Sequence, residues 1–162
     1  MDSNILVEGA QIGEKLCVKP TEYDIGPEYR ILQFNGRIKR MMSLAKKVAY
    51  NCEADDYKHG AVLAKGGTVI NTAFNKNSHC SFGYRFRNIN LGLPTLHAEI
   101  GAVIGIDRSV TTGATLYVCR VGKNGDYRLS KPCPMCYAAL KHVGVRKVVW
   151  TINNKECGTY KL

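Results

Sequence analysis

The clearest pattern along the chain is an amphipathic stripe between Ile38 and Cys52. Apolar side chains recur there at the three- and four-residue spacing of an α-helix, and basic side chains occupy the opposite face. The apolar positions are Ile38, Met41, Met42, Ala45, Val48, Ala49 and Cys52. A stripe of this width is typical of a helix that lies on a hydrophobic core. The pattern therefore predicts a helix over 38–52 with one buried face.

Two short apolar runs, partly β-branched, follow at residues 60–64 and 68–74. The tripeptide Lys65-Gly66-Gly67 separates them. Because glycine readily adopts the positive φ of the tight turns that join antiparallel strands, this spacing predicts a β-hairpin.

Helical and extended patterns alternate after the hairpin. A helical stripe follows Pro94, with apolar residues at Leu96, Ile100, Val103 and Ile104. We then expect a strand over 114–121, a helix over about 134–143 and a strand over 145–152. This alternation predicts an α/β fold in which helices cover the faces of a layered sheet.

The first 33 residues have a different character. They are net acidic and contain several glycines and prolines, which argue against a long helix or a central strand. We therefore expect an irregular N-terminal arm over 1–33 and a single folded domain over 34–162.

The composition is that of one folded domain, with 162 residues, of which 45% are hydrophobic and 22% charged. No uncharged stretch approaches the roughly 20 apolar residues of a membrane span, so we expect no membrane association.

The chain begins Met1-Asp2-Ser3-Asn4, without the basic segment and apolar run of a secretory signal, and we expect a cytoplasmic protein. In a reducing compartment the seven cysteines are better explained as packing groups, metal ligands or nucleophiles than as disulfides.

Charge is distributed unevenly along the chain. The formal net charge is +10, but residues 1–56 hold 8 basic and 9 acidic groups, whereas residues 57–162 hold 15 and 4. A basic field attracts anions, so phosphate-bearing small molecules and nucleic acids are both favoured partners. The segment 82–87 interleaves aromatic residues with Arg85 and Arg87. Such a mixture can stack bases and bind phosphates, although two arginines on a surface loop are also commonly just solvated.

Two short motifs carry the candidate chemistry. His97-Ala98-Glu99 and Pro132-Cys133-Pro134-Met135-Cys136 each begin a predicted helix. Catalytic zinc takes three protein ligands and leaves a fourth position for water, so His97, Cys133 and Cys136 form a suitable set. Cys133 and Cys136 lie three residues apart, which places both sulfurs on one helix face. Either motif alone is unspecific, but together they indicate zinc.

The two motifs match the H-x-E…P-C-x-x-C signature of zinc deaminases. Over residues 38–152, the sequence resembles the cytidine and deoxycytidylate deaminase superfamily. The resemblance includes Gly60-Ala61-Val62 in the first predicted strand and Asn75 after the second. It implies a three-layer α/β/α fold with a mixed central sheet.

The resemblance also implies the site residues. It assigns His97, Cys133 and Cys136 as Zn²⁺ ligands and Glu99 as the catalytic acid and base. Asn75 and Ala61 become substrate contacts, although they could equally be a turn residue and a core residue. Arg85 and Arg87 are candidate phosphate contacts near the site. His59, just before the first strand of the hairpin, is a further candidate.

The sequence departs from its relatives at the C-terminus. Relatives commonly continue with another helix and a fifth strand, but only ten residues follow Ile152. We expect shortened C-terminal elements, with residues 158–162 as a short edge strand or the edge covered by a partner chain. This argument predicts a homo-oligomer.

Three functions remain open at this point. The leading one is a hydrolase that deaminates a free cytosine nucleotide, most simply dCMP to dUMP, by cleaving an amidine C–N bond. The second is a deaminase of single-stranded DNA, RNA or tRNA, which the basic charge also favours. The third is a non-catalytic zinc-stabilised binding or assembly protein. Glu99 argues against the third, because a structural zinc site needs no carboxylate beside it.

Overall fold

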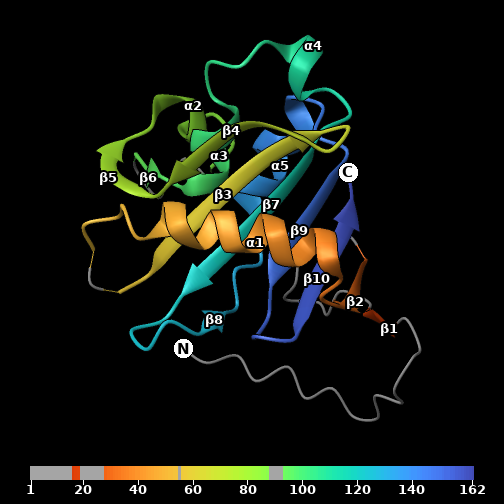
Figure 1. Cartoon of the computed structure of the whole chain (residues 1–162). Helices are drawn as coiled ribbons and strands as arrows, with labels where there is room; N and C mark the ends of the chain where they lie inside the picture. Colours follow the sequence, from red (N-terminus) through yellow and green to blue (C-terminus); the bar gives the residue numbers. More distant parts are fainter. Residues whose placement is uncertain (1–15, 19–27, 55, 88–92) are drawn as a thin grey trace.

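The computed structural model describes residues 16–18, 28–54, 56–87 and 93–162. A central sheet lies between two helical layers (Figure 1). Helix α1 (Gly36–Ala49) covers one face of the sheet, and α3 (Ala98–Val103) and α5 (Pro134–His142) cover the other. This arrangement confirms the predicted three-layer α/β/α fold.

The central sheet is mixed. Along its main path the strands run in the order β1 (Leu16–Val18), β2 (Tyr29–Gln33), β10 (Glu156–Lys161), β9 (Lys147–Thr151), β7 (Thr115–Val121), β3 (Lys58–Lys65) and β4 (Thr68–Phe74). Among these described strands only β7 and β9 pair in parallel. The remaining short elements are β5 (Lys76–His79), β6 (Thr95–Leu96), β8 (Tyr127–Arg128), α2 (Ser81–Tyr84) and α4 (Arg108–Thr111).

Helix α1 begins and ends close to the predicted positions. The Asn35 side chain caps its N-terminus by accepting a hydrogen bond from the Ile38 N–H at 2.9 Å. Beyond Ala49, the N–H groups of Asn51 and Cys52 bond to carbonyls three residues back, so the chain tightens into a turn. This tightening ends the helix three residues before the predicted position.

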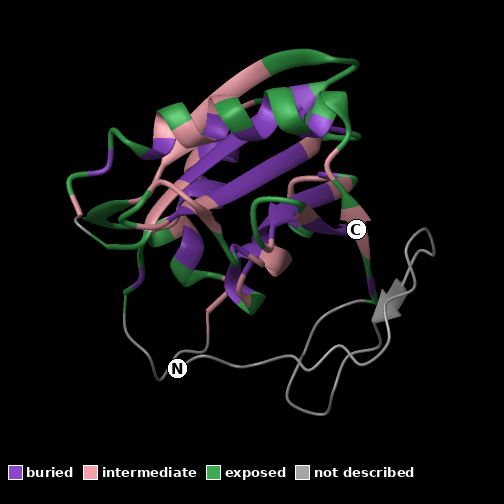
Figure 2. Ribbon diagram, turned by 60° about the horizontal axis from the view of Figure 1, so that its bottom comes forward, coloured by how far each residue is buried: buried purple, intermediate pink, exposed green. Residues whose placement is uncertain are grey.

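The predicted hairpin is confirmed as the antiparallel pair β3 and β4. Gly66 and Gly67 both have positive φ, at 59° and 83°, as the tight turn requires. Side chains of β3 alternate between the two faces of the sheet. Ala61 and Leu63 pack in the core under α3 and α5, whereas Val62 and Ala64 pack under α1. The sheet is therefore buried on both faces, as Figure 2 shows for its central strands.

The segment before α1 differs from the predicted irregular arm. Tyr29–Gln33 forms strand β2, which pairs antiparallel with β10, and β1 pairs in turn with β2. Gly26 and Pro27 suggested a loop, but the strand begins just after them. Tyr29 is buried and packs edge-on against Trp150, with ring centroids 5.3 Å apart. The rest of the arm, 1–15 and 19–27, lies outside the described residues.

The C-terminus also differs from the edge strand considered above. Strand β9 is followed directly by β10 with no helix between them, so these elements are indeed short. Strand β10 is not at the edge, however, because β9 and β2 pair with its two sides. The edge that seemed to need a partner chain is covered by the N-terminal segment of the same chain.

The loop between β7 and α5 forms a hairpin. Tyr127 and Arg128 turn back and pair with the end of β7.

No helix in the described part of the chain is long and apolar enough to span a membrane.

Candidate metal centre and adjoining cavity

Three potential metal ligands converge where α3 and α5 begin. His97 precedes α3, Cys133 precedes α5, and Cys136 lies in the first turn of α5. The His97 Nδ1 atom lies 3.3 Å from the Cys136 Sγ and 3.7 Å from the Cys133 Sγ. The ligand atoms of all three residues lie within 4.8 Å of one another. The predicted set is therefore brought together in the folded chain.

These separations fit a tetrahedral zinc ion. Zn–N bonds of about 2.0 Å and Zn–S bonds of about 2.3 Å place neighbouring nitrogen and sulfur ligands roughly 3.5 Å apart. The two His97–sulfur distances lie on either side of that value. A soft His/Cys/Cys set also selects zinc over the hard cations that prefer oxygen ligands. The residues present therefore fit Zn²⁺.

The two sulfurs form a coupled pair. A hydrogen bond from Cys136 is the main reason that the pKa of Cys133 falls to about 4, and His97 lowers it further. The same interaction, together with burial, raises the pKa of Cys136. The hydrogen bond to Cys133 also raises the pKa of His97. A cation held by both sulfurs would replace the proton that they share.

Glu99 is a buried carboxyl beside this cluster. It is only 6% exposed and lies in the first turn of α3, two residues after His97. Burial raises its pKa to about 7. A carboxyl that titrates near neutrality can both accept and donate a proton at physiological pH. Glu99 is therefore suited to acid–base chemistry and is separate from the His/Cys/Cys set.

A cavity of about 320 Å³ opens onto the cluster. Its lining residues are Tyr57, His59, Asn75, Thr95, His97, Ala98, Glu99, Leu129, Ser130, Lys131 and Cys133. The volume is at the lower end of the range for small-ligand sites, about 300–1,000 Å³. Glu99 and two of the metal ligands therefore border a space that can admit a small organic ligand.

Two predicted substrate contacts, His59 and Asn75, line this cavity. The Asn75 side chain accepts a hydrogen bond from the His59 N–H at 2.9 Å and donates one to the Tyr57 carbonyl at 3.0 Å. Asn75 thus fastens the start of β3 to the end of β4. Burial lowers the pKa of His59 to about 4, so its ring is neutral at pH 7.

Ala61 lies elsewhere. It is fully buried in the core under α3 and α5 and contributes nothing to the cavity lining among the described residues. Its contact with substrate stays a prediction.

The two arginines of segment 82–87 also lie outside the cavity. The Arg85 guanidinium lies over the rings of Phe82 and Phe86, at 5.6 and 5.8 Å from their centroids. Arg87 borders a neighbouring cavity of about 610 Å³, whose lining includes His97 and Cys133. The structure therefore brings Arg87, and not Arg85, next to the metal centre.

Sequence reasoning missed Tyr57, Leu129 and Ser130 as cavity residues. Ser130 is buried, and its hydroxyl lies 2.9 Å from both the Val118 carbonyl and the Thr151 hydroxyl. These residues belong to no recognisable motif. Long-range strand pairing places them at the cavity, and no local sequence pattern predicts their position there.

Comparison with known families identifies one match. A family model described as the cytidine and deoxycytidylate deaminase zinc-binding region matches residues 36–152. This region covers the helices, the central strands and all three candidate ligands. No curated protein sequence shows significant similarity to the chain.

Several solved structures resemble this chain. The apo dCMP deaminase of cyanophage S-TIM5 is 23% identical, with 74% of this chain and 86% of that chain covered and a TM-score of 0.49. The same enzyme with dCMP and dUMP is 22% identical, with 72% and 82% covered and a TM-score of 0.47. Acinetobacter baumannii RibD is 23% identical, with a TM-score of 0.45. That match covers 72% of this chain but only 28% of RibD.

Proposed function

Because the chain belongs to the cytidine and deoxycytidylate deaminase family, we propose that it is a zinc-dependent hydrolase that deaminates a cytosine nucleotide. The simplest such reaction converts dCMP to dUMP and releases ammonia. One observation carries the proposal most directly. A buried carboxyl with a pKa of about 7, Glu99, lies beside the His/Cys/Cys cluster and borders a cavity of small-ligand size.

His97, Cys133 and Cys136 would hold the zinc. When bound, Zn²⁺ acidifies a water in its open fourth position and so makes a nucleophile available near neutral pH. Through the zinc, Cys133 and Cys136 at the start of α5 would be connected to His97, which precedes α3. The three ligands would therefore also hold in place the starts of the two helices beside the cavity.

Glu99 would carry the protons. In this proposal its carboxylate accepts a proton from the attacking water and delivers it to the ring nitrogen N3 of cytosine. It then takes the second proton of the same water, now a hydroxyl on C4, and passes it to the amino group, so that the C4–N bond breaks, ammonia leaves and C4 becomes a carbonyl. A pKa near 7 suits both directions of transfer, because neither protonation state is strongly favoured at the working pH.

Asn75 and His59 would position the base and the sugar. The Asn75 amide oxygen and one amide N–H hold the backbone around Tyr57 and His59, which leaves the second N–H of the amide for a ligand. The neutral His59 ring offers a hydrogen-bonding nitrogen without a charge. Ala61, Arg85 and Arg87 stay predicted contacts, and the position of Arg87 beside the metal centre favours it over Arg85.

A polynucleotide substrate is the second candidate. A net charge of +10 suits a strand with many phosphates as well as it suits one nucleotide. The specific observation that favours it is a further cavity of about 560 Å³, which shares Tyr57 and Leu129 with the first and is lined by Arg120, Lys123 and Arg128. A cytoplasmic location is proposed with either function.

A substrate panel tests the proposal. The zinc-loaded protein is incubated with dCMP, deoxycytidine, dCTP, single-stranded oligonucleotides and tRNA, and ammonia release is measured for each. We expect dCMP to be deaminated.

Glu99→Gln keeps the shape of the side chain but cannot transfer protons, so we expect it to lose at least about 10²- to 10⁴-fold in activity while still binding zinc. Activity of Glu99→Gln within a few-fold of wild type would remove Glu99 from the mechanism.

A further inference from the structure

The segment 129–133 has no helix or strand of its own, yet it forms much of the site. It joins strand β8 to helix α5 and contributes Leu129, Ser130, Lys131 and Cys133 to the lining of the cavity of about 320 Å³. Cys133 is also one of the three potential metal ligands. Because no regular ladder of backbone hydrogen bonds holds such a segment, other contacts must fix its position.

Ser130 lies where the pairing of β7 with β9 ends. The parallel register of these strands reaches only Val118 and Trp150, although β7 continues to Val121. Beyond this point the Ser130 hydroxyl accepts a hydrogen bond from the Thr151 N–H at 3.0 Å and donates one to the Val118 carbonyl at 2.9 Å. The Ser130 N–H donates to the Thr151 carbonyl at 2.9 Å. One residue of the segment is thus bound to both strands.

The Thr151 hydroxyl extends this network. It donates to the Arg128 carbonyl at 2.6 Å and accepts from the Arg120 N–H at 3.3 Å. Its oxygen lies 2.9 Å from that of the Ser130 hydroxyl, so the two side chains act together to join β7, β8 and β9 to the segment. Thr151 is fully buried and Ser130 is only 4% exposed. Loss of either hydroxyl would leave buried backbone groups without a partner, which is costly.

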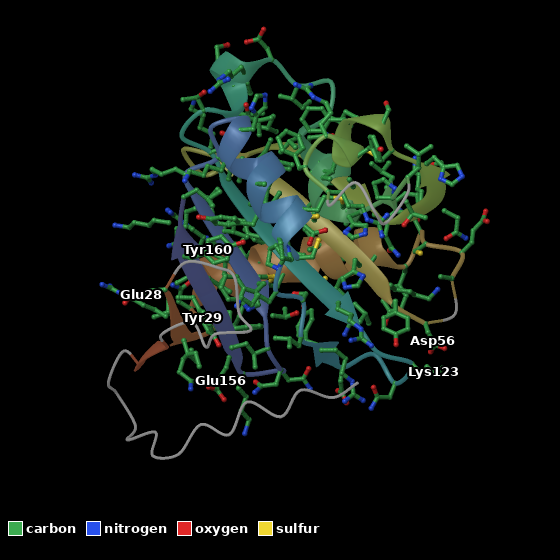
Figure 3. All side chains as sticks on the ribbon, turned by 180° about the vertical axis from the view of Figure 1, so that it is seen from behind. Glu28, Tyr29, Asp56, Lys123, Glu156 and Tyr160 are labelled. Atoms are coloured by element: carbon green, nitrogen blue, oxygen red, sulfur yellow. The ribbon has the colours of Figure 1, made fainter. Side chains whose placement is uncertain are left out.

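A second contact holds the segment one residue further along the chain. The Lys131 Nζ lies 4.6 Å from the centroid of the Tyr29 ring, which is a cation–π contact. Tyr29 (Figure 3) belongs to strand β2, which precedes the family region 36–152. The N-terminal strand therefore supports the same segment as the two hydroxyls.

We infer that Ser130 and Thr151 are positioning residues for the metal centre and for the cavity beside it. Their hydroxyls hold Cys133 where it meets the other two ligands. They also hold Leu129 and Lys131 at the border of the cavity. Neither hydroxyl needs to transfer a proton, and each acts only through the segment 129–133. The inference rests on the proposed function only in that the cavity binds the substrate.

Zinc release tests the inference without any catalysis. Zinc-loaded protein is mixed with an excess of the chelating dye 4-(2-pyridylazo)resorcinol, and zinc transfer is followed by absorbance. Thr151→Val nearly keeps the shape of the side chain but removes the hydroxyl. We expect it to release zinc about tenfold faster or more, as for other residues that support metal ligands. Ser130→Ala should act in the same direction, and Thr151→Ser, which retains a hydroxyl, should keep the wild-type rate.

Thr111→Val is the matched control. Thr111 is also fully buried, and its hydroxyl donates to a backbone carbonyl, that of Val143, at 2.6 Å. This bond lies at the C-terminal end of α5, opposite to the end that carries the cysteines. Both valine variants lose one buried hydroxyl, so Tm measured by circular dichroism should fall for both. Only Thr151→Val should release zinc faster.

Steady-state kinetics with dCMP test the cavity. Glu99 lies on α3, whereas the hydroxyl network joins β7, β8 and β9. With zinc in excess, we therefore expect Thr151→Val to raise KM for dCMP several-fold and to change kcat less. The double variant S130A/T151V should behave much like either single variant, because the two hydroxyls act in one network.

The outcomes separate this inference from the proposed function. If no cytosine nucleotide is deaminated but Thr151→Val releases zinc faster than Thr111→Val, the proposed function fails and the positioning role stands. Equal release from these two variants would overturn the inference, because the hydroxyls would then only stabilise the sheet. Fast release from Thr151→Ser would also overturn it, since the hydroxyl would not be the group that matters.

Two further results complete the test. An unchanged KM for dCMP in an active Thr151→Val would overturn the part of the inference that concerns the cavity. If Thr151→Val does not fold, Ser130→Ala is compared with Thr111→Val in its place, with the same expected difference in zinc release.

Discussion

Cys133 and Cys136 lie one helical turn apart, yet their surroundings differ. Cys136 is fully buried, whereas Cys133 borders the cavity of about 320 Å³. Together with His97 they provide the only group of three potential metal ligands found among the described residues. Since this group joins the starts of α3 and α5, zinc binding and folding should be coupled.

We predict that Cys136→Ser lowers both zinc content and thermal stability, because serine replaces a soft thiolate ligand with a hydroxyl. Zinc per chain is measured by atomic emission, and Tm by circular dichroism. Cys157→Ser is the control, since Cys157 is equally buried but lies beside the Leu32 carbonyl, away from the site. Full zinc occupancy in Cys136→Ser would contradict the ligand assignment.

His59 gives a prediction about pH. Burial lowers its pKa to about 4 in the folded chain from about 6.5 in the unfolded one. Between these values the unfolded chain binds a proton at His59 that the folded chain does not, so the free energy of unfolding should fall as pH falls from about 6.5 to 4. We expect His59→Gln to weaken this pH dependence.

Urea denaturation of wild type and His59→Gln at several pH values measures the effect. Loss of zinc at low pH affects both proteins, so the informative quantity is the difference between them. That difference should change mainly below about pH 6.5. A constant difference from pH 7 to pH 4 would show that His59 does not titrate as described.

The contact between α1 and β3 depends on one small residue. A Cβ atom at Gly60 would lie 1.9 Å from the Ala45 carbonyl oxygen and 2.9 Å from the Ala49 backbone nitrogen. Both are backbone atoms, so no side chain can move to make room. The absence of a side chain at Gly60 lets the helix lie directly on strand β3, next to His59 of the cavity lining.

We predict that Gly60→Ala destabilises the protein by about 1–3 kcal/mol or more, because α1 must move away from the sheet. Gly36→Ala is the matched control, since its nearest neighbour would be the end of the Arg40 side chain at 3.8 Å. Alanine favours helix formation at position 36, so the control should be neutral or stabilising. Urea denaturation compares the two. Equal stability of both variants would refute the close packing of α1 on β3.

At the scale of the whole molecule, the edges of the central sheet among the described strands are β1 and β4, because β2 covers the free side of β10. Strand β4 has an exposed start, with Thr68 and Val69 open to solvent. An exposed edge strand can pair with another chain. The edge that first suggested a homo-oligomer is thus covered, and β4 is the better candidate surface.

We predict a homo-oligomer in solution with β4 at or near the interface. Light scattering at micromolar concentrations should give a mass above the 17.9 kDa of one chain. Val69→Lys places a charge on the exposed edge and should shift the mass toward the monomer. A monomeric mass for wild type at all concentrations would count against this prediction.

Local sequence patterns determined much of this fold. The helical stripe from Ile38, the glycine turn between β3 and β4, and the spacing of Cys133 and Cys136 each lie within one element. Periodicity and turn chemistry act over a few residues, so elements of this kind can be predicted from the sequence without a structure. The candidate His/Cys/Cys set could be proposed for the same reason, since each motif begins a helix, and only the fold shows that the three residues meet.

Only the tertiary structure decided which distant residues share a surface. The pairing of β2 with β10 joins residues near the two ends of the chain, and Gly26 and Pro27 gave the opposite expectation. Strand register sets Arg120 beside His59, and a strained backbone turns Tyr57 toward Arg120. Long-range register depends on the packing of the whole core, so no local pattern could show which residues line the cavity beside the His/Cys/Cys set or separate Arg85 from it.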